Sequence, residues 1–116
     1  MSSRYNAKLI LAGDRNNLEI APGAEVTFDA EHLGQQPFQP LRLEIKAPAG
    51  WLVLELRFQR VNELSAPVPA EMFAPDVWMP DMVLPVIRPG EHVELVMRNG
   101  GTATGKATAR LLGTVW

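Results

Sequence analysis

The stretch Trp51-Leu52-Val53-Leu54-Glu55-Leu56-Arg57-Phe58-Gln59-Arg60 decides the fold class. Apolar and polar residues alternate along it, which is typical of a β-strand with one buried face. The side chains that share the apolar face of such a strand are Leu52, Leu54, Leu56 and Phe58. We therefore predict that Leu54 and Leu56 lie in the core, and that Glu55 and Arg57 face solvent or a partner.

Other parts of the chain show the same two-residue period. Residues 25–30, 41–46 and 91–98 alternate clearly, and the second of these runs is expected to bury Leu41, Leu43 and Ile45. Weaker strand candidates are residues 8–12, 18–20, part of 77–87 and 107–115. Pro-Gly and Gly-rich turns separate these runs, and one helical turn is expected at residues 70–73, behind Pro69. The pattern predicts an all-β domain, most simply a jelly-roll-like β-sandwich of about eight short antiparallel strands, with a small barrel as the alternative.

Length and composition indicate a single β-sandwich domain over residues 1–116, with a polar N-terminal arm at about residues 1–7. The chain has 116 residues, a formal net charge of −2 and no cysteine. The absence of cysteine excludes disulfides and thiolate metal sites. Its basic residues are scattered, so nucleic acid is not an expected partner. The apolar run at residues 9–12 is too short for a signal peptide or a membrane span, so we expect a cytoplasmic chain that leaves only as part of a larger assembly.

One stretch satisfies part of a phosphate-binding motif. Residues 100–106 match G-x-x-x-x-G-K and follow a predicted strand. The next residue, Ala107, lacks the hydroxyl that would hold Mg²⁺. Only ten residues follow Lys106, so no further strand after this segment can bring a second metal-binding carboxylate. We predict a glycine-rich loop that binds no nucleotide.

The other candidates for chemistry are also weak. His32 and His92 are far apart and have no partner at metal-ligand spacing, so both are expected on solvated surface. Asp76 and Asp81 are too few for a Ca²⁺ loop. Serine occurs in no nucleophile elbow. We therefore expect no catalytic residue, no metal and no cofactor, and a protein that is not an enzyme.

The remaining feature is the apolar stretch at residues 72–85, which holds three of the five methionines and is interrupted by three prolines. Proline removes a ladder donor, so the stretch is not an ordinary central strand. Either it covers one end of the core or it presents adaptable and aromatic side chains to a partner. The residues proposed for a partner interface are Tyr5, Phe73, Val77, Trp78, Met79 and Met82. Trp51 and the terminal Trp116 are expected to be core anchors, with partner contact or sugar stacking as alternatives.

Four segments carry a family resemblance. In chain order they are Gln36-Pro37-Phe38-Gln39-Pro40-Leu41-Arg42-Leu43, then Val68-Pro69-Ala70-Glu71-Met72-Phe73, then Arg88-Pro89-Gly90 leading through Val93-Glu94-Leu95 to Arg98-Asn99, and finally Ala109-Arg110-Leu111-Leu112-Gly113-Thr114. From about Pro22 onward the chain resembles small bacteriophage virion proteins, the decoration or cement proteins of assembled capsids. The shared motifs are turn and core patterns, and they contain no reactive group.

The resemblance implies a jelly-roll-like sandwich that bridges neighbouring subunits of the major capsid protein as repeated, symmetric copies. The expected partners are then the major capsid protein and copies of the chain itself, with no nucleic acid and no membrane. The expected location is the capsid surface of the virion, and the host cytoplasm during assembly. Two alternatives remain. A carbohydrate-binding or adhesion sandwich would stack sugars on Trp51, Trp78 or Tyr5, and a cupin-type metal enzyme would need a histidine cluster that the sequence lacks.

Overall fold

The structure, a computed structural model, describes residues 5–13 and 19–115, so most of the predicted N-terminal arm and Trp116 lie outside the described residues. The described part is nearly all β, and its only helical element is one 3₁₀ turn. In chain order the elements are β1 (Ala7–Gly13), β2 (Glu25–Glu31), β3 (Phe38–Lys46), β4 (Leu52–Phe58), β5 (Val61–Asn62), β6 (Val68–Pro69), η1 (Ala70–Phe73), β7 (His92–Arg98) and β8 (Thr108–Val115).

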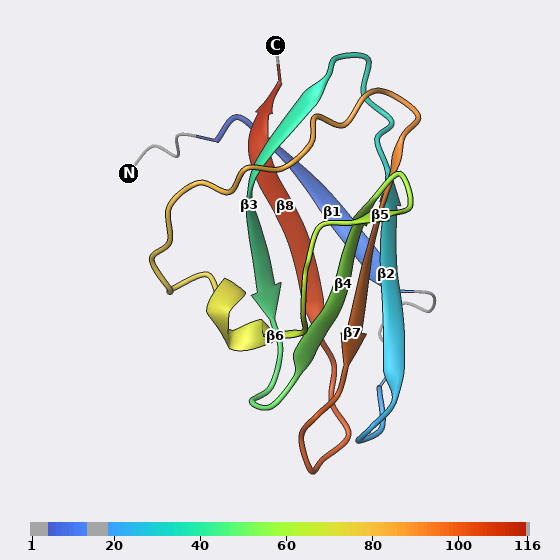
Figure 1. Cartoon of the computed structure of the whole chain (residues 1–116), viewed down its shortest axis with the longest axis vertical. Helices are drawn as coiled ribbons and strands as arrows, with labels where there is room; N and C mark the ends of the chain where they lie inside the picture. The colour runs from blue at the N-terminus through green and yellow to red at the C-terminus, as the bar shows by residue number, and fades with distance from the viewer. Residues whose placement is uncertain (1–4, 14–18, 116) are drawn as a thin grey trace.

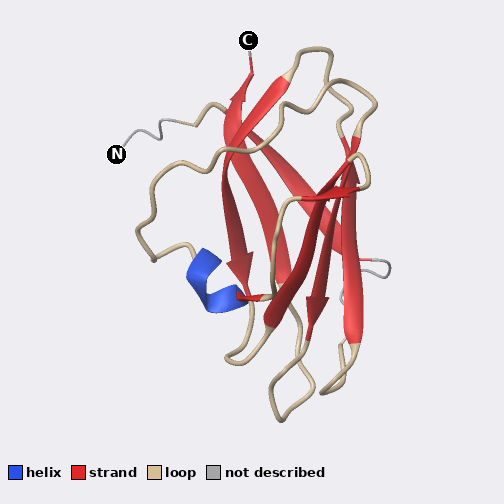
Figure 2. Cartoon of the chain, in the orientation of Figure 1, coloured by secondary structure: helices blue, strands red, loops and turns tan. Residues whose placement is uncertain are grey.

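These strands form two antiparallel sheets packed as a sandwich (Figures 1 and 2). One has the order β3-β8-β1, and the other has the order β2-β7-β4, with β5 and β6 both paired to β4. β1 joins the two sheets, because its first part pairs with β8 and its end pairs with β2. In a jelly roll the first and third strands flank the last one, and the second and fourth flank the seventh. The predicted jelly-roll-like sandwich is confirmed.

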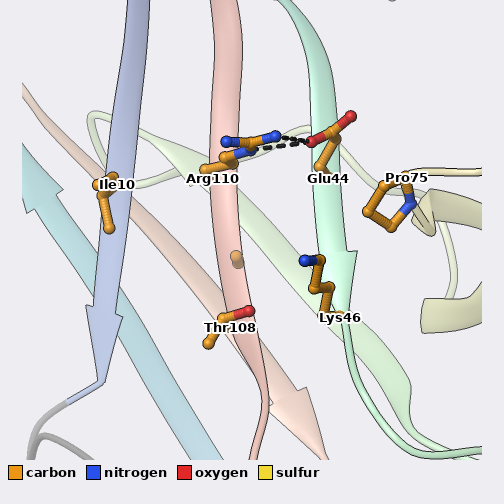
Figure 3. A pocket seen from close by; sticks show the side chains of 7 residues that line it. Ile10, Glu44, Lys46, Pro75, Thr108 and Arg110 are labelled. Atoms are coloured by element: carbon orange, nitrogen blue, oxygen red, sulfur yellow. Dashed lines mark hydrogen bonds and ion pairs between the residues drawn. The ribbon is translucent and has the colours of Figure 1, made fainter.

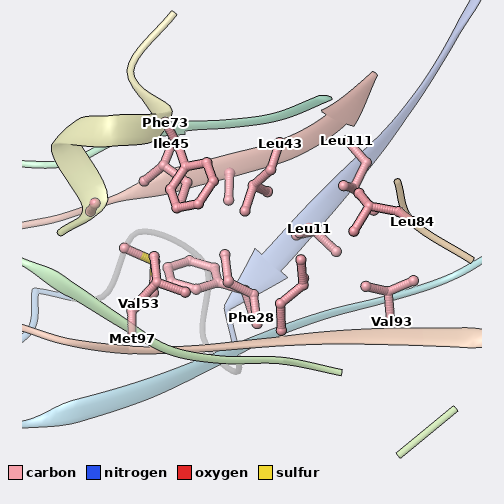
Figure 4. Packing of buried hydrophobic residues seen from close by; sticks show 14 of the residues in the cluster. Leu11, Phe28, Leu43, Ile45, Val53, Phe73, Leu84, Val93, Met97 and Leu111 are labelled. Atoms are coloured by element: carbon pink, nitrogen blue, oxygen red, sulfur yellow. The ribbon is translucent and has the colours of Figure 1, made fainter. Parts of the chain in front are cut away.

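The apolar faces of the two sheets meet in one core. In Figure 4, Leu43 and Ile45 of β3 face Val53 of β4 and Met97 of β7 across it. Side chains that are essentially inaccessible to solvent come from both sheets: Phe38, Leu43, Ile45, Trp51, Val53, Leu56, Ile87, Val93, Leu95, Met97 and Leu111. Trp51 is therefore a core anchor, as predicted, and its ring is not available as a sugar platform.

The predicted phase of β4 is wrong in its first half. Val53 pairs with Met97 and Glu55 pairs with Val96, so Leu54 is the extra residue of a β-bulge. The bulge shifts the inward side by one residue, and the fully or nearly buried side chains of the strand become Val53, Leu56 and Phe58. Leu56 is a core residue, as predicted, whereas Leu52 and Leu54 are only half-buried, and so are Glu55 and Arg57.

A second bulge displaces the start of β3. Pro40 pairs with Gly113 and Arg42 with Leu112, so Leu41 is the extra residue and is half-buried instead of facing the core with Leu43. A Cβ on Gly113 would overlap the carbonyl oxygen of Gln39, so the two strands approach this closely only because residue 113 is glycine. After the bulge, Leu43 and Ile45 point inward, as predicted, and Arg42, Glu44 and Lys46 point outward.

The other strand predictions hold with small changes. Residues 25–30 and 91–98 correspond to β2 and β7, the weaker candidates at 8–12 and 107–115 correspond to β1 and β8, and the helical turn at 70–73 is η1. Of the candidate at 18–20, residue 18 lies outside the described residues and Ile20 forms an isolated bridge with Gly105. The segment at 77–87 forms no regular strand.

The β4–β5 hairpin has an unfavourable turn. Its two linking residues, Gln59 and Arg60, have φ angles of 53° and 71°. Two-residue hairpin turns with positive φ at both positions favour Asn-Gly, because most other side chains are sterically disfavoured at positive φ. We expect replacement of Gln59-Arg60 by Asn-Gly to raise the free energy of unfolding by about 1 kcal/mol. Urea unfolding followed by circular dichroism measures this, and an unchanged or lower midpoint would contradict it.

Candidate functional site

The candidate site is built on residues 74–86, called the strap below, which run along the outside of β3 after η1. Its first half is held by Arg42, whose Nη2 donates hydrogen bonds to the carbonyl oxygens of Ala74 (3.1 Å), Pro75 (3.4 Å) and Val77 (2.8 Å). Arg42 is itself 8% exposed. One buried guanidinium therefore fixes the backbone of the strap as far as the residue before Trp78.

The second half of the strap follows the edge of β3. The backbone N–H of Met82 donates to the carbonyl oxygen of Leu41 at 2.7 Å, and the Gln39 side-chain amide donates to the carbonyl oxygen of Leu84 at 2.8 Å. Just after the strap, Ile87 forms a two-way backbone bridge with Phe38. In a jelly roll the sixth strand lies beside the third, so the strap occupies that place in irregular form.

The prolines of the strap explain why it forms no regular strand. Pro75, Pro80 and Pro85 have no N–H to donate, so a continuous ladder with β3 cannot form. The strap still covers the edge of β3, which would otherwise present unpaired backbone groups. The strap thus covers an edge of the sandwich and also presents apolar side chains to solvent.

The structure brings most of the proposed interface residues together on or beside the strap. Trp78 is 85% exposed and Val77 is 39% exposed. Met79 and Met82 are half-buried against the core. Tyr5 reaches the strap from the other end of the chain, and its hydroxyl donates to Oδ1 of Asp81 at 3.3 Å.

Phe73 does not belong to this exposed set. It is 4% exposed and packs in the core, because the η1 turn points it between the sheets (Figure 4). On or beside the strap, three exposed apolar residues were not singled out from the sequence: Met72 (53%), Val83 (99%) and Val86 (37%). The exposure of Val83 could have been predicted from its alternation with the buried Leu84. The prolines on both sides make the alternating run too short to recognise.

The strap region is acidic as well as apolar. Between Ala70 and Ile87 the sequence has Glu71, Asp76 and Asp81, and no Lys, Arg or His. All three carboxylates are exposed. The exposed Trp78 therefore lies in a segment that carries only negative side-chain charge.

The outward face of the β3-β8-β1 sheet borders the strap and has a different charge. Glu44 lies between two guanidinium groups, with its Oε1 2.7 Å from Nη2 of Arg110 and its Oε2 3.3 Å from Nε of Arg42. Beside this cluster is a hollow of about 230 Å³ lined by Ile10, Glu44, Lys46, Pro75, Thr108, Ala109 and Arg110 (Figure 3). Pro75 belongs to the strap, so strap and hollow adjoin.

The histidines differ from one another. The prediction of solvated surface is confirmed for His92, whose side chain is 58% exposed and has Nε2 3.1 Å from Oε1 of Glu31. It is wrong for His32, which is 9% exposed. The Nε2 atom of His32 lies 2.6 Å from the carbonyl oxygen of Gln36, and its ring packs beside Phe38 with centroids 6.1 Å apart. His32 thus organises the loop before β3.

The remaining residues considered for metal binding or catalysis, two aspartates and the serines, do not form a cluster in the described part of the chain. Asp76 and Asp81 are both exposed. Over residues 5–13 and 19–115 no group of three or more His, Asp or Glu side chains gathers as metal ligands would. Ser2 and Ser3 lie outside the described residues, and Ser65 is exposed in the loop before β6.

The glycine-rich loop is organised by Asn99, which is fully buried. The Nδ2 atom of Asn99 donates to the carbonyl oxygens of Ile20 (2.8 Å) and Ala103 (2.9 Å), and Oδ1 accepts from the N–H of Gly101 (2.9 Å). The loop leads into strand β8 and not into the helix that a phosphate-binding loop opens.

We expect Lys106→Ala to leave the fold intact and to change no nucleotide affinity, because Lys106 is exposed on a loop shaped by Asn99. Calorimetry with ATP and Mg²⁺ tests this. Micromolar binding that disappears in the variant would establish a nucleotide site at the loop.

In the described part of the chain, no helix is long and apolar enough to cross a membrane. Comparisons with protein-family models, with curated proteins and with solved structures found no match for this chain.

Proposed function

We propose that this chain is a non-enzymatic structural protein of a bacteriophage virion, which decorates or cements the capsid by bridging major capsid subunits, and that the strap makes contacts between subunits of this assembly. The observation that carries the proposal is the exposure of Trp78 and Val83, 85% and 99%, on a segment fixed to the sandwich. Aromatic residues and methionine are enriched at protein interfaces. The proposed location is the capsid surface, and the host cytoplasm during assembly.

The geometry supports a docking role in two ways. Arg42, Gln39 and the backbone of Leu41 hold the strap in place, so a partner would pay little ordering entropy to bind it. The jelly-roll order is also the fold that the resemblance to decoration proteins implies. On a symmetric shell each modest contact is repeated many times, so a weak single interface can still reinforce the assembly.

The test uses capsids of a phage that encodes this chain, prepared without it. We expect the purified chain to co-sediment with these capsids and to raise their resistance to heat, and Trp78→Ala to abolish binding while keeping the circular dichroism spectrum. Leu33→Ala is the matched control, because Leu33 is 82% exposed but lies outside the strap. Failure of the unmodified chain to bind such capsids would reject the proposal.

A second candidate function is carbohydrate binding. Trp78 is an exposed ring in the same segment as the exposed carboxylates of Asp76 and Asp81, a combination that can stack on a sugar and accept its hydroxyl hydrogens. A glycan array distinguishes the two. Retention of a defined sugar that is lost in Trp78→Ala, together with no capsid binding, would favour the carbohydrate-binding module.

A further inference from the structure

The strap and the outward face of the β3-β8-β1 sheet lie on the same side of the molecule. Arg42 points outward from β3 and holds the carbonyl oxygens of strap residues 74, 75 and 77. Pro75 of the strap lines the hollow together with Ile10 and Arg110 (Figure 3). One partner surface could therefore contact both features at once.

The two features have opposite charge. The charged residues of β1, β3 and β8 are four basic ones, Lys8, Arg42, Lys46 and Arg110, against the single acidic Glu44. Glu44 is already shared between two guanidinium groups, so the face keeps an excess of positive charge. The neighbouring segment from Ala70 to Ile87 carries carboxylates and no base.

The two features also match in apolar character. Two apolar side chains flank the hollow, Ile10, which is 62% exposed, on the β1 side and Pro75 on the β3 side (Figure 3). The strap offers Trp78, a side chain whose large apolar ring gains most from burial. An acidic, aromatic ridge thus borders a basic hollow with an apolar lining.

We propose that the partner of the strap is a second copy of this chain, joined through a two-fold axis so that each Trp78 enters the hollow of the other copy and each Asp76 meets the partner's basic rim at Lys46 and Arg110. A two-fold interface requires one self-complementary patch, and adjoining surfaces of opposite charge provide it. This inference rests on the proposed function, because it names the partner of the same strap. The dimer is then the unit that decorates the shell, and Trp78→Ala abolishes capsid binding by separating that dimer.

Sedimentation equilibrium of the full chain tests the proposal. We expect a dimer at low ionic strength that weakens as salt is added, because the contacts between Asp76 and the basic rim are screened. Asp76→Lys and Lys46→Glu should each weaken dimerisation about tenfold or more, since each places like charges together. Trp78→Ala should also yield monomers. Arg60→Glu is the control for an exposed charge change elsewhere, because Arg60 lies in the β4–β5 turn of the other sheet.

The charge swap gives the most specific outcome. Mixing the Asp76→Lys chain with the Lys46→Glu chain pairs the new lysine with the new glutamate and the original Asp76 with the original Lys46, so both contacts of the heterodimer are complementary. We expect this mixture to dimerise more tightly than either variant alone. Circular dichroism of each variant separates loss of the interface from loss of the fold.

Two results would overturn this inference. One is an unmodified chain that stays monomeric at about 1 mM, where even a weak interface would be half occupied. The other is a dimer that Asp76→Lys, Lys46→Glu and Trp78→Ala leave unchanged. Capsid binding by a chain that is strictly monomeric would reject the dimer and keep the decorating role, whereas a strap-dependent dimer that binds no capsid would reject the decorating role and keep the dimer.

Discussion

Leu56→Ala lowers the free energy of unfolding by about 2–5 kcal/mol, because Leu56 is fully buried between the sheets and its truncation leaves a cavity in the core. Leu54→Ala lowers it by only about 1 kcal/mol, because the bulge turns Leu54 away from the core and leaves it half-buried. The two variants remove the same atoms two positions apart on one strand, so each is the control for the other.

Urea unfolding of both variants measures the difference from the change in midpoint at constant slope. Equal losses for Leu54→Ala and Leu56→Ala would mean that the strand keeps an unbroken two-residue period and that the bulge at residue 54 is absent.

Arg42→Ala lowers the free energy of unfolding by about 2–4 kcal/mol and releases the strap. The change removes the donor shared by three strap carbonyl oxygens and one of the two guanidinium groups that hold Glu44. Hydrogen exchange should show the largest gain in residues 74–80, and limited proteolysis should cut there first.

Arg42→Lys keeps the charge but cannot place several donors in the same plane, so it should recover only part of the loss. Arg110→Ala is the control on the other side of Glu44. The side chain of Arg110 is 45% exposed, so we expect a smaller effect and no release of the strap. Unchanged exchange of residues 74–80 in Arg42→Ala would show that other contacts fix the strap.

Where a strand is regular, the alternation of apolar and polar residues correctly predicted which side chains face the core. β7 pairs with β2 without a register shift, and Val93, Leu95 and Met97 are all buried, as their spacing indicates. A bulge adds one residue without altering composition, so the phase of Leu41 and Leu54 could not be read from the period alone.

The candidate site was predictable in its location and less so in its details. Proline spacing and residue type identified the strap and the exposed Trp78. The burial of Phe73 depends on where η1 packs, and that is set by contacts distant in sequence. The role of Arg42 has the same origin, because its three acceptors lie more than thirty residues away in the chain. An outward arginine in an alternating strand gives no sign that a later segment will bury it.

The position of the last two strands has a consequence for how the chain folds. β8 is the central strand of one sheet and β7 lies between β2 and β4 in the other, so neither sheet is complete without residues 92–115. The pairing of Ala7 with Gly113 also joins the first strand to the last one. During synthesis the earlier strands can make only their few pairings with one another until β7 and β8 emerge, and folding then proceeds on the order of milliseconds to seconds, as in other domains dominated by distant pairings. Premature termination before Thr108 would leave the apolar faces of β1 and β3 without the strand that joins them.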